Sequence, residues 1–149
     1  MLRLRAAGEP LPVAAALISP WVDLTLSEPS IDAHGHDYLD RAALERFSEH
    51  YLQGADPRNH EVSPVLADLH GLPPLLVMSG DAEVFHDEHR SLATAAEAVG
   101  VDVTLSVGQG MVHAWPAFAA VVPEGRVALD EVGAFLSDRL GGKRAGEAG

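Results

Sequence analysis

The sequence predicts an α/β fold in which helices flank a parallel sheet. Apolar runs alternate with helical patterns along its 149 residues, an order typical of parallel strands joined by helical crossovers. Two of the runs, 13–21 and 74–79, are continuously apolar, as expected for strands buried on both faces. The run 101–107 alternates apolar and polar residues, which predicts an edge strand with one solvated face.

Helices are predicted between and after these strands. Asp40 can cap a helix over 41–52, and further helices are expected over 86–99 and 125–140, each followed by glycine. One short helical turn is predicted over 65–69. The residues predicted to face inward are Leu44, Phe47 and Tyr51 in the first helix, Leu92, Ala95, Ala96 and Val99 in the second, and Val127, Leu129, Val132, Phe135, Leu136 and Leu140 in the third.

Composition excludes several classes of function. The net charge is -12, from 22 acidic and 10 basic residues, which argues against nucleic acid or an anionic membrane as a partner. The chain has no cysteine, so it has no disulfide framework or thiolate chemistry. No apolar run is long enough to span a membrane, and the first residues do not resemble a signal peptide. We therefore expect a cytoplasmic protein without a cofactor.

The first residues form an incomplete element. Residues 2–7 have the composition of a helix end, followed by Gly8 as a helix stop and Pro10 as a breaker. A helix with no start of its own predicts that further sequence precedes this segment in longer relatives.

Polar residues follow the carboxyl ends of all three predicted strands, in segments 19–23, 80–83 and 108–113. Ligand and catalytic groups collect at this edge of a parallel sheet. His113 and a carboxylate from the neighbouring segment would be two parts of a nucleophilic triad, in which the acid orients the imidazole and the imidazole takes a proton. Position alone leaves open a surface or capping role for this histidine.

Three stretches together carry a resemblance to a known family: LPVAAALISPWVDL, YLQGADPRNHEVSPVLADLHGLPPLLVMSGDAEVFHDE and GQGMVHAWPAF. In this order they resemble the C-terminal part of bacterial hormone-sensitive-lipase-like esterases, an α/β-hydrolase family, over residues 2–140. The resemblance implies a partial α/β-hydrolase fold of C-terminal parallel strands with flanking helices. It makes residues 1–142 the C-terminal half of the domain, with 143–149 as a disordered tail.

The same resemblance implies site residues. The glycine-rich turn of the family carries the catalytic histidine, which corresponds to His113, and the catalytic acid corresponds to Glu83, 113 − 83 = 30 residues earlier. Many members have aspartate at this position, so Asp87 is the alternative acid, or else a residue that caps its helix or supports the loop. Trp21 and Trp115 are candidates to line a substrate pocket, with core packing as the alternative.

The nucleophile motif of the family, G-x-S-x-G, is absent from the 149 residues, as is an oxyanion loop of the H-G-G-G type. The resemblance implies a member of a carboxylic ester hydrolase family, whose Ser-His-acid mechanism acts on small esters. Because the nucleophile elbow and the oxyanion loop are missing, we expect this chain to be inactive alone. Whether the chain is a fragment, starts at a misassigned codon or is a true half-domain stays open.

Two alternatives to the hydrolase remain. One is a non-catalytic remnant that self-associates. The family resemblance implies a dimer contact through 101–107 and 125–140, and the missing strands predict an exposed edge at 13–21. The chain would then form a homo-oligomer or pair with a missing N-terminal half. The other is a metal site at His86 and His89, or at His34 and His36, but the spacing of a zinc motif is absent and we expect no metal.

Overall fold

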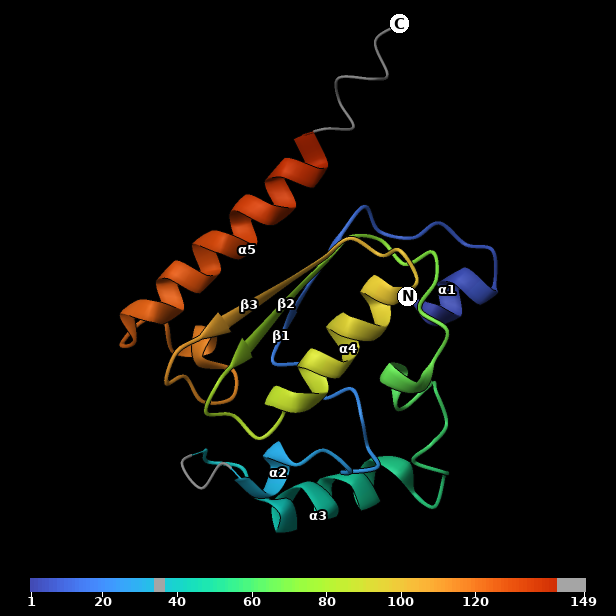
Figure 1. Ribbon diagram of the computed structural model, residues 1–149, viewed down its shortest axis with the longest axis vertical. Coiled ribbons are helices and arrows are strands. Elements are labelled where there is room, and N and C mark those ends of the chain that lie inside the picture. Colours follow the sequence, from blue (N-terminus) through green and yellow to red (C-terminus); the bar gives the residue numbers. More distant parts are fainter. Residues whose placement is uncertain (34–36, 142–149) are drawn as a thin grey trace, which may run out of the picture.

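Three parallel strands form a single sheet in the computed structural model, which describes residues 1–33 and 37–141 (Figure 1). Strand β2 lies in the middle and pairs with β1 on one side and β3 on the other. The predicted α/β fold with parallel strands is confirmed. The strands are β1 (Ala15–Ile18), β2 (Leu75–Gly80) and β3 (Val103–Gly108).

Helices cover both faces of this sheet. The helix α4 packs on one face with α1 beside it, and α5 crosses the other face (Figure 1). Alternate residues of β2 supply the two cores, because neighbouring side chains of a strand point to opposite faces. The helical elements are α1 (Leu2–Ala6), α2 (Ser30–Ala33), α3 (Arg41–Leu52), η1 (Pro64–Leu66), α4 (His86–Ala98), η2 (Trp115–Phe118) and α5 (Pro123–Gly141).

The central strand matches its prediction and the first strand does not. Every residue of β2 is buried, whereas β1 is only partly buried and its last residue, Ile18, is 37% exposed. The expectation that 13–21 is buried on both faces is therefore wrong. The reason is its position, since β1 pairs only with β2 among the described residues and its outer edge has no described neighbour.

The predicted cap of α3 is confirmed, because the side chain of Asp40 accepts a hydrogen bond from the amide of Ala43 at 2.7 Å. Several residues predicted to face inward are instead exposed. In α3 only Leu44 of the predicted stripe is buried, and the other helices carry similar exceptions, because no described element covers those sides. The exposed residues are Phe47, Tyr51, Val99, Val127, Leu129 and Leu140.

Helix α4 buries two polar side chains that the hydrophobic pattern did not predict, Glu88 and His89, both without exposed surface. The Oε1 atom of Glu88 accepts a hydrogen bond from the amide of Val22 at 2.6 Å. This contact fixes the segment that follows β1. Burial raises the pKa of Glu88 to about 9, against the lowering effect of the Val22 amide, so its carboxyl group is neutral at neutral pH.

None of the described helices combines the length and the apolar character that crossing a lipid bilayer requires. The predicted tail 143–149 and the residues His34 and His36 lie outside the described residues.

Glu88 makes the stability of the fold depend on pH. A carboxyl group whose pKa is raised by folding stabilises the folded state fully below its ordinary pKa of 4.5 and loses that contribution as the pH rises toward about 9. Glu88→Gln keeps the carbonyl that accepts from Val22 but does not titrate. From about pH 5 to about pH 9 we expect the wild type to lose a few kcal/mol more of its unfolding free energy than the variant.

Urea unfolding of both proteins at a series of pH values measures this difference. Parallel pH profiles for wild type and Glu88→Gln would contradict the assignment of a neutral carboxyl group to Glu88.

Candidate functional site

The three segments that follow the strands meet at one edge of the sheet. Ser19 comes directly after β1, Glu83 follows β2 and His113 follows β3. The predicted convergence of 19–23, 80–83 and 108–113 is confirmed by hydrogen bonds between all three segments. The sheet topology thus brings together residues separated by up to 95 positions in the chain.

Ser19 links the other two segments through its hydroxyl group. The hydroxyl donates a hydrogen bond to Oε2 of Glu83 at 2.6 Å and accepts one from the amide of Ala114 at 3.0 Å. Both Ser19 and Ala114 have left-handed backbone conformations, with φ of 43° and 53°. Such conformations are strained in residues other than glycine, and here two of them lie on either side of one hydrogen bond.

The carboxylate of Glu83 is completely buried. Its Oε2 atom accepts from Ser19, and its Oε1 atom lies 2.8 Å from Nδ1 of His89. The other ring nitrogen of His89, Nε2, lies 2.8 Å from the carbonyl oxygen of Pro20. Ser19, in the segment that follows β1, and His89, in α4, thus lie on two sides of the candidate acid.

His113 is half-buried and stands between aromatic rings. Its imidazole makes edge contacts with Phe85, at 5.2 Å between ring centroids, and with Tyr38, at 5.9 Å. The Tyr38 hydroxyl also donates to the carbonyl oxygen of His113 at 3.1 Å. These contacts restrict both the ring and the backbone of the candidate base.

Burial lowers the pKa of His113, and the nearby carboxylates of Glu83 and Asp37 oppose this effect. The imidazole is therefore neutral at neutral pH, which is the form that accepts a proton. Its Nδ1 atom is buried and has no hydrogen-bond partner within the described part of the chain. Among the described residues, Glu83 and His113 do not form a direct hydrogen bond. Their pairing as acid and base therefore stays a prediction.

Asp87 is engaged elsewhere. Its Oδ2 atom accepts from the amide of Ser30 at 3.0 Å, and the hydroxyl of Ser30 accepts from the Asp87 amide at 3.2 Å. These bonds join the first turn of α4 to α2, which is the supporting role considered from the sequence. A second carboxylate, Asp37, accepts from the amide of Val84 beside Glu83 at 2.9 Å.

The two tryptophans differ in environment. Trp115 is buried in the core between the sheet and α5, with Leu76 and Met78, so core packing accounts for it. Trp21 is half-buried and stacks on Phe85 at 5.3 Å between centroids. Because Phe85 also contacts His113, Trp21 remains a candidate to line a pocket at the site.

Glycines allow the loops to approach closely. A Cβ atom on Gly80 would clash with the carbonyl group of Met111, and one on Gly108 would lie 2.7 Å from the side chain of Met111. The amide of Ala82 donates to the carbonyl oxygen of Met111 at 3.1 Å. The backbone before Glu83 thus lies directly against the backbone before His113.

Comparison with known proteins now adds to this geometry. A model of the alpha/beta hydrolase fold, Abhydrolase_3, matches residues 1–117. The chain belongs to the α/β-hydrolase family. It is 46% identical to an acetyl-hydrolase of Streptomyces hygroscopicus over 140 residues, which are 93% of this chain and 47% of that protein.

Solved structures of family members agree with this assignment. One is an esterase from the bacterial hormone-sensitive lipase family, with a TM-score of 0.90, 39% identity and coverage of 93% of this chain and 47% of that one. Another is EstE5, soaked with p-nitrophenyl butyrate, with a TM-score of 0.89, 37% identity and the same coverage. The predicted resemblance to hormone-sensitive-lipase-like esterases is confirmed, and the chain spans about half the length of the relatives that it matches.

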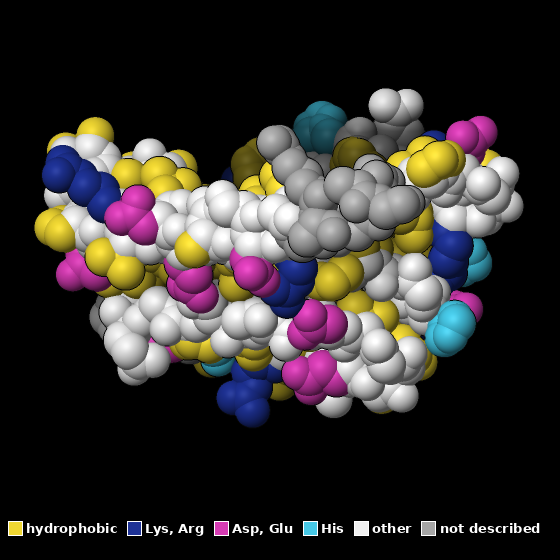
Figure 2. All heavy atoms as spheres, turned by 90° about the horizontal axis from the view of Figure 1, so that it is seen from above, with side chains coloured by type: hydrophobic (Ala, Val, Ile, Leu, Met, Phe, Trp, Pro, Cys, Tyr) yellow, Lys and Arg dark blue, Asp and Glu magenta, His cyan; other side chains and the backbone are white. Residues whose placement is uncertain are grey.

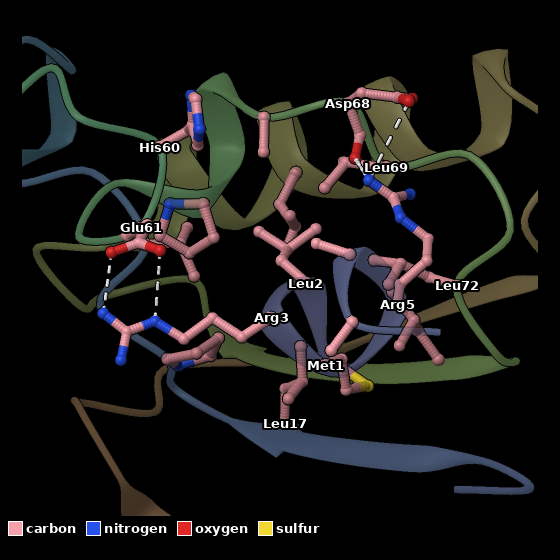
Figure 3. A pocket seen from close by; sticks show the side chains of 18 residues that line it. Met1, Leu2, Arg3, Arg5, Leu17, His60, Glu61, Asp68, Leu69 and Leu72 are labelled. Atoms are coloured by element: carbon pink, nitrogen blue, oxygen red, sulfur yellow. Dashed lines mark hydrogen bonds and ion pairs between the residues drawn. The ribbon is translucent and has the colours of Figure 1, made fainter. Parts of the chain in front are cut away.

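A cavity of this partial α/β-hydrolase fold lies away from His113. It has a volume of about 830 Å³ and an apolar lining from α1, β1 and the segment 60–72. In Figure 3, Arg3 and Arg5 extend from α1 to opposite sides of this cavity, where they contact Glu61 and Asp68. Neither Glu83 nor His113 lines it.

His86 and His89 both contact the side chain of Ser79. The Nδ1 atoms of both rings lie 3.0 Å from the hydroxyl oxygen of Ser79. Within residues 1–33 and 37–141, no group of three or more His, Asp or Glu side chains is arranged to hold a metal ion.

Sequence reasoning placed the segment 19–23 at this edge but missed the hydrogen bonds of Ser19, and it missed His89 and Asp37 as neighbours of the site. A signal existed for His89, which lies three residues before the inward-facing Leu92 and so falls on the buried stripe of its helix. The position of Ser19 at the end of the first apolar run was a weaker signal. Nothing in the local pattern placed Asp37 beside Val84.

Gly80 provides a test of the loop arrangement. Gly80→Ala adds a methyl group where the Met111 carbonyl lies, so the two backbones must separate. We expect a loss of about 1–3 kcal/mol of unfolding free energy and displaced amide resonances for residues 111–114. Gly133→Ala, on the exposed part of α5 with free space around the added methyl group, serves as the matched control and should be neutral or stabilising.

Urea unfolding and amide NMR spectra measure both variants. Unperturbed resonances over 111–114 in a folded Gly80→Ala protein would contradict the close approach of these backbones.

Proposed function

We propose that this chain supplies the acid and the base of a Ser-His-acid carboxylic ester hydrolase, with Glu83 as the acid and His113 as the base. The observation that carries the proposal is the Ser19 hydroxyl, which bonds both to Glu83 and to the amide next to His113. This link holds an acid and an imidazole near each other at the edge of the sheet where hydrolases of this fold carry their triad.

The electrostatics of His113 support a role as general base. Its lowered pKa keeps the imidazole neutral at neutral pH, ready to take the proton of an attacking hydroxyl group. The imidazolium that forms would be stabilised by the negative charges of Glu83 and Asp37, both of which act on His113 electrostatically. A carboxylate that stabilises the imidazolium without taking its proton is the role of a triad acid.

The nucleophile and the oxyanion donors of this reaction are not among the 149 residues, which contain neither G-x-S-x-G nor H-G-G-G. Acid and base alone do not perform acyl transfer by this mechanism. We therefore propose that the chain by itself is inactive toward esters and that a serine elbow supplied from outside it completes the triad.

A chimera tests this function. Residues 1–141 would replace the matching segment of the acetyl-hydrolase of Streptomyces hygroscopicus, with p-nitrophenyl butyrate as substrate because EstE5 was soaked with this ester. We expect the isolated chain to show no hydrolysis above buffer and the chimera to be active. His113→Ala and Glu83→Gln in the chimera should each lower kcat/KM, the former by roughly 10³-fold or more.

Two control variants sharpen the result. Asp87→Asn should retain most of the activity, because Asp87 bonds to Ser30 and not to the site, and His50→Ala alters only an exposed histidine of α3. An active chimera that tolerates His113→Ala would refute the proposal. Loss of activity in Asp87→Asn but not in Glu83→Gln would transfer the acid role to Asp87.

A second candidate function is self-association of a non-catalytic module. Several apolar side chains of α5 that were predicted to face inward are exposed, including Val127 with 68% and Leu140 with 56% of its surface accessible. Ile18 is also exposed, at the edge of β1 that pairs with no other described strand. Figure 2 shows hydrophobic side chains at several places on one face of the molecule. Burial of such surface between two copies would be favourable.

Sedimentation velocity over a range of concentrations tests this alternative. Self-association through the helix predicts a dimer that Val127→Lys weakens by at least tenfold in Kd, while Ala134→Lys, at an exposed position of the same helix, has a smaller effect. A monomer at all concentrations would exclude this function.

A further inference from the structure

The buried contacts of Glu83 include one that the triad itself does not use. His89 belongs to α4 and has no exposed surface. Its Nδ1 atom lies 2.8 Å from Oε1 of Glu83. The carboxylate therefore has two histidine neighbours, His113 on the loop after β3 and His89 in the interior.

The hydrogen-bond partners of His89 determine its protons. A carbonyl oxygen only accepts, so the 2.8 Å contact with Pro20 requires a hydrogen on Nε2. On the other side of the ring, Nδ1 lies 2.8 Å from Oε1 of Glu83, and Oε1 accepts no hydrogen bond within the described part of the chain. An unprotonated nitrogen and a carboxylate oxygen at this distance would repel each other. A second proton must therefore lie on Nδ1 of His89 or on the carboxyl group of Glu83.

Ser19 decides between these two positions. Its hydroxyl oxygen already accepts from the amide of Ala114, so its own hydrogen points to Oε2 of Glu83 at 2.6 Å. That length is typical of a hydroxyl donating to an ionised carboxylate. With Glu83 ionised, the second proton belongs to Nδ1 of His89.

The remaining contacts are consistent with this assignment. The hydroxyl oxygen of Ser79 lies 3.0 Å from Nδ1 of His89, where it can accept, and 3.0 Å from Nδ1 of His86, to which it can donate. Among the described residues, the other charged or titratable groups around this cluster include His113, Tyr38 and Asp37 on the loops and Glu88 in the same helix. Glu88 is neutral, so it does not compete for the positive ring.

We propose that His89 is a buried imidazolium that pairs with Glu83 and acts, together with Ser19, as a positioning residue for the acid of the proposed triad. Ser19 donates to one carboxylate oxygen, and the charged ring of His89 lies 2.8 Å from the other. The positive charge of His89 reduces the pull of Glu83 on His113, which adds to the effect of burial in keeping His113 neutral. The proposal rests on the proposed function for its catalytic meaning, but the charge pair itself does not.

Histidine titration by NMR on the chain itself tests the proposal without any need for hydrolysis. In His89→Gln the positive charge is lost while a polar side chain remains, so the pKa of His113 should rise by about half a unit or more. His86→Gln is the matched control, because it removes a histidine side chain of the same helix that contacts Ser79 but makes no hydrogen bond or ion pair with the Glu83 carboxylate. That variant should leave the titration of His113 unchanged.

A measurement on the wild type covers the case in which His89→Gln does not fold. The ¹⁵N shifts of the His89 ring should show both nitrogens protonated at neutral pH. A neutral ring with an unprotonated Nδ1 overturns the proposal, as does an unchanged His113 titration in folded His89→Gln. If the chimera is inactive but these NMR results appear, the proposed function fails and the buried pair stands.

Discussion

The hydroxyl group of Ser19 is the interaction on which the arrangement of the site depends. It joins the segments after all three strands, because it donates to Glu83 and accepts from Ala114. Parallel strands bring these segments to a common edge but do not fix their relative positions. Two residues in left-handed conformations, Ser19 and Ala114, are held in place by this bond, so local strain is retained where the site is built.

Buried polar groups set the electrostatics of this region. Glu83, Glu88 and His89 have no exposed surface, and burial of such groups is costly unless each has a partner. The structure resolves this in two ways. Glu88 stays neutral and its Oε1 atom accepts from a backbone amide, whereas Oε2 of Glu83 accepts from Ser19 and its Oε1 lies beside the ring of His89. The second oxygen of each carboxyl group accepts no hydrogen bond within the described residues.

Much of the fold follows from local sequence. The continuous apolar run of β2 and the alternating run of β3 follow from periodicity, and the cap of α3 follows from the residue type of Asp40. Periodicity did not predict which side chains are exposed. Phe47 and Val127 have the spacing of core residues, but they are exposed because no described element packs against them. The roles of Ser19 and His89 were not predicted for a related reason. Both depend on Glu83, which lies 64 residues from Ser19 and six from His89 and comes close to them only in the folded chain.

The contact between Gly80 and Met111 has a consequence for sequence variation. The two loops touch through main-chain atoms, with the Ala82 amide donating to the Met111 carbonyl. The spacing between acid and histidine is thus set by peptide groups, which every amino acid shares. Substitutions at Ala82 can alter the chemistry around the site without changing this spacing, whereas any side chain at position 80 forces the two backbones apart. Evolutionary freedom at this edge of the sheet is therefore uneven, being wide beside the contact and narrow at its centre.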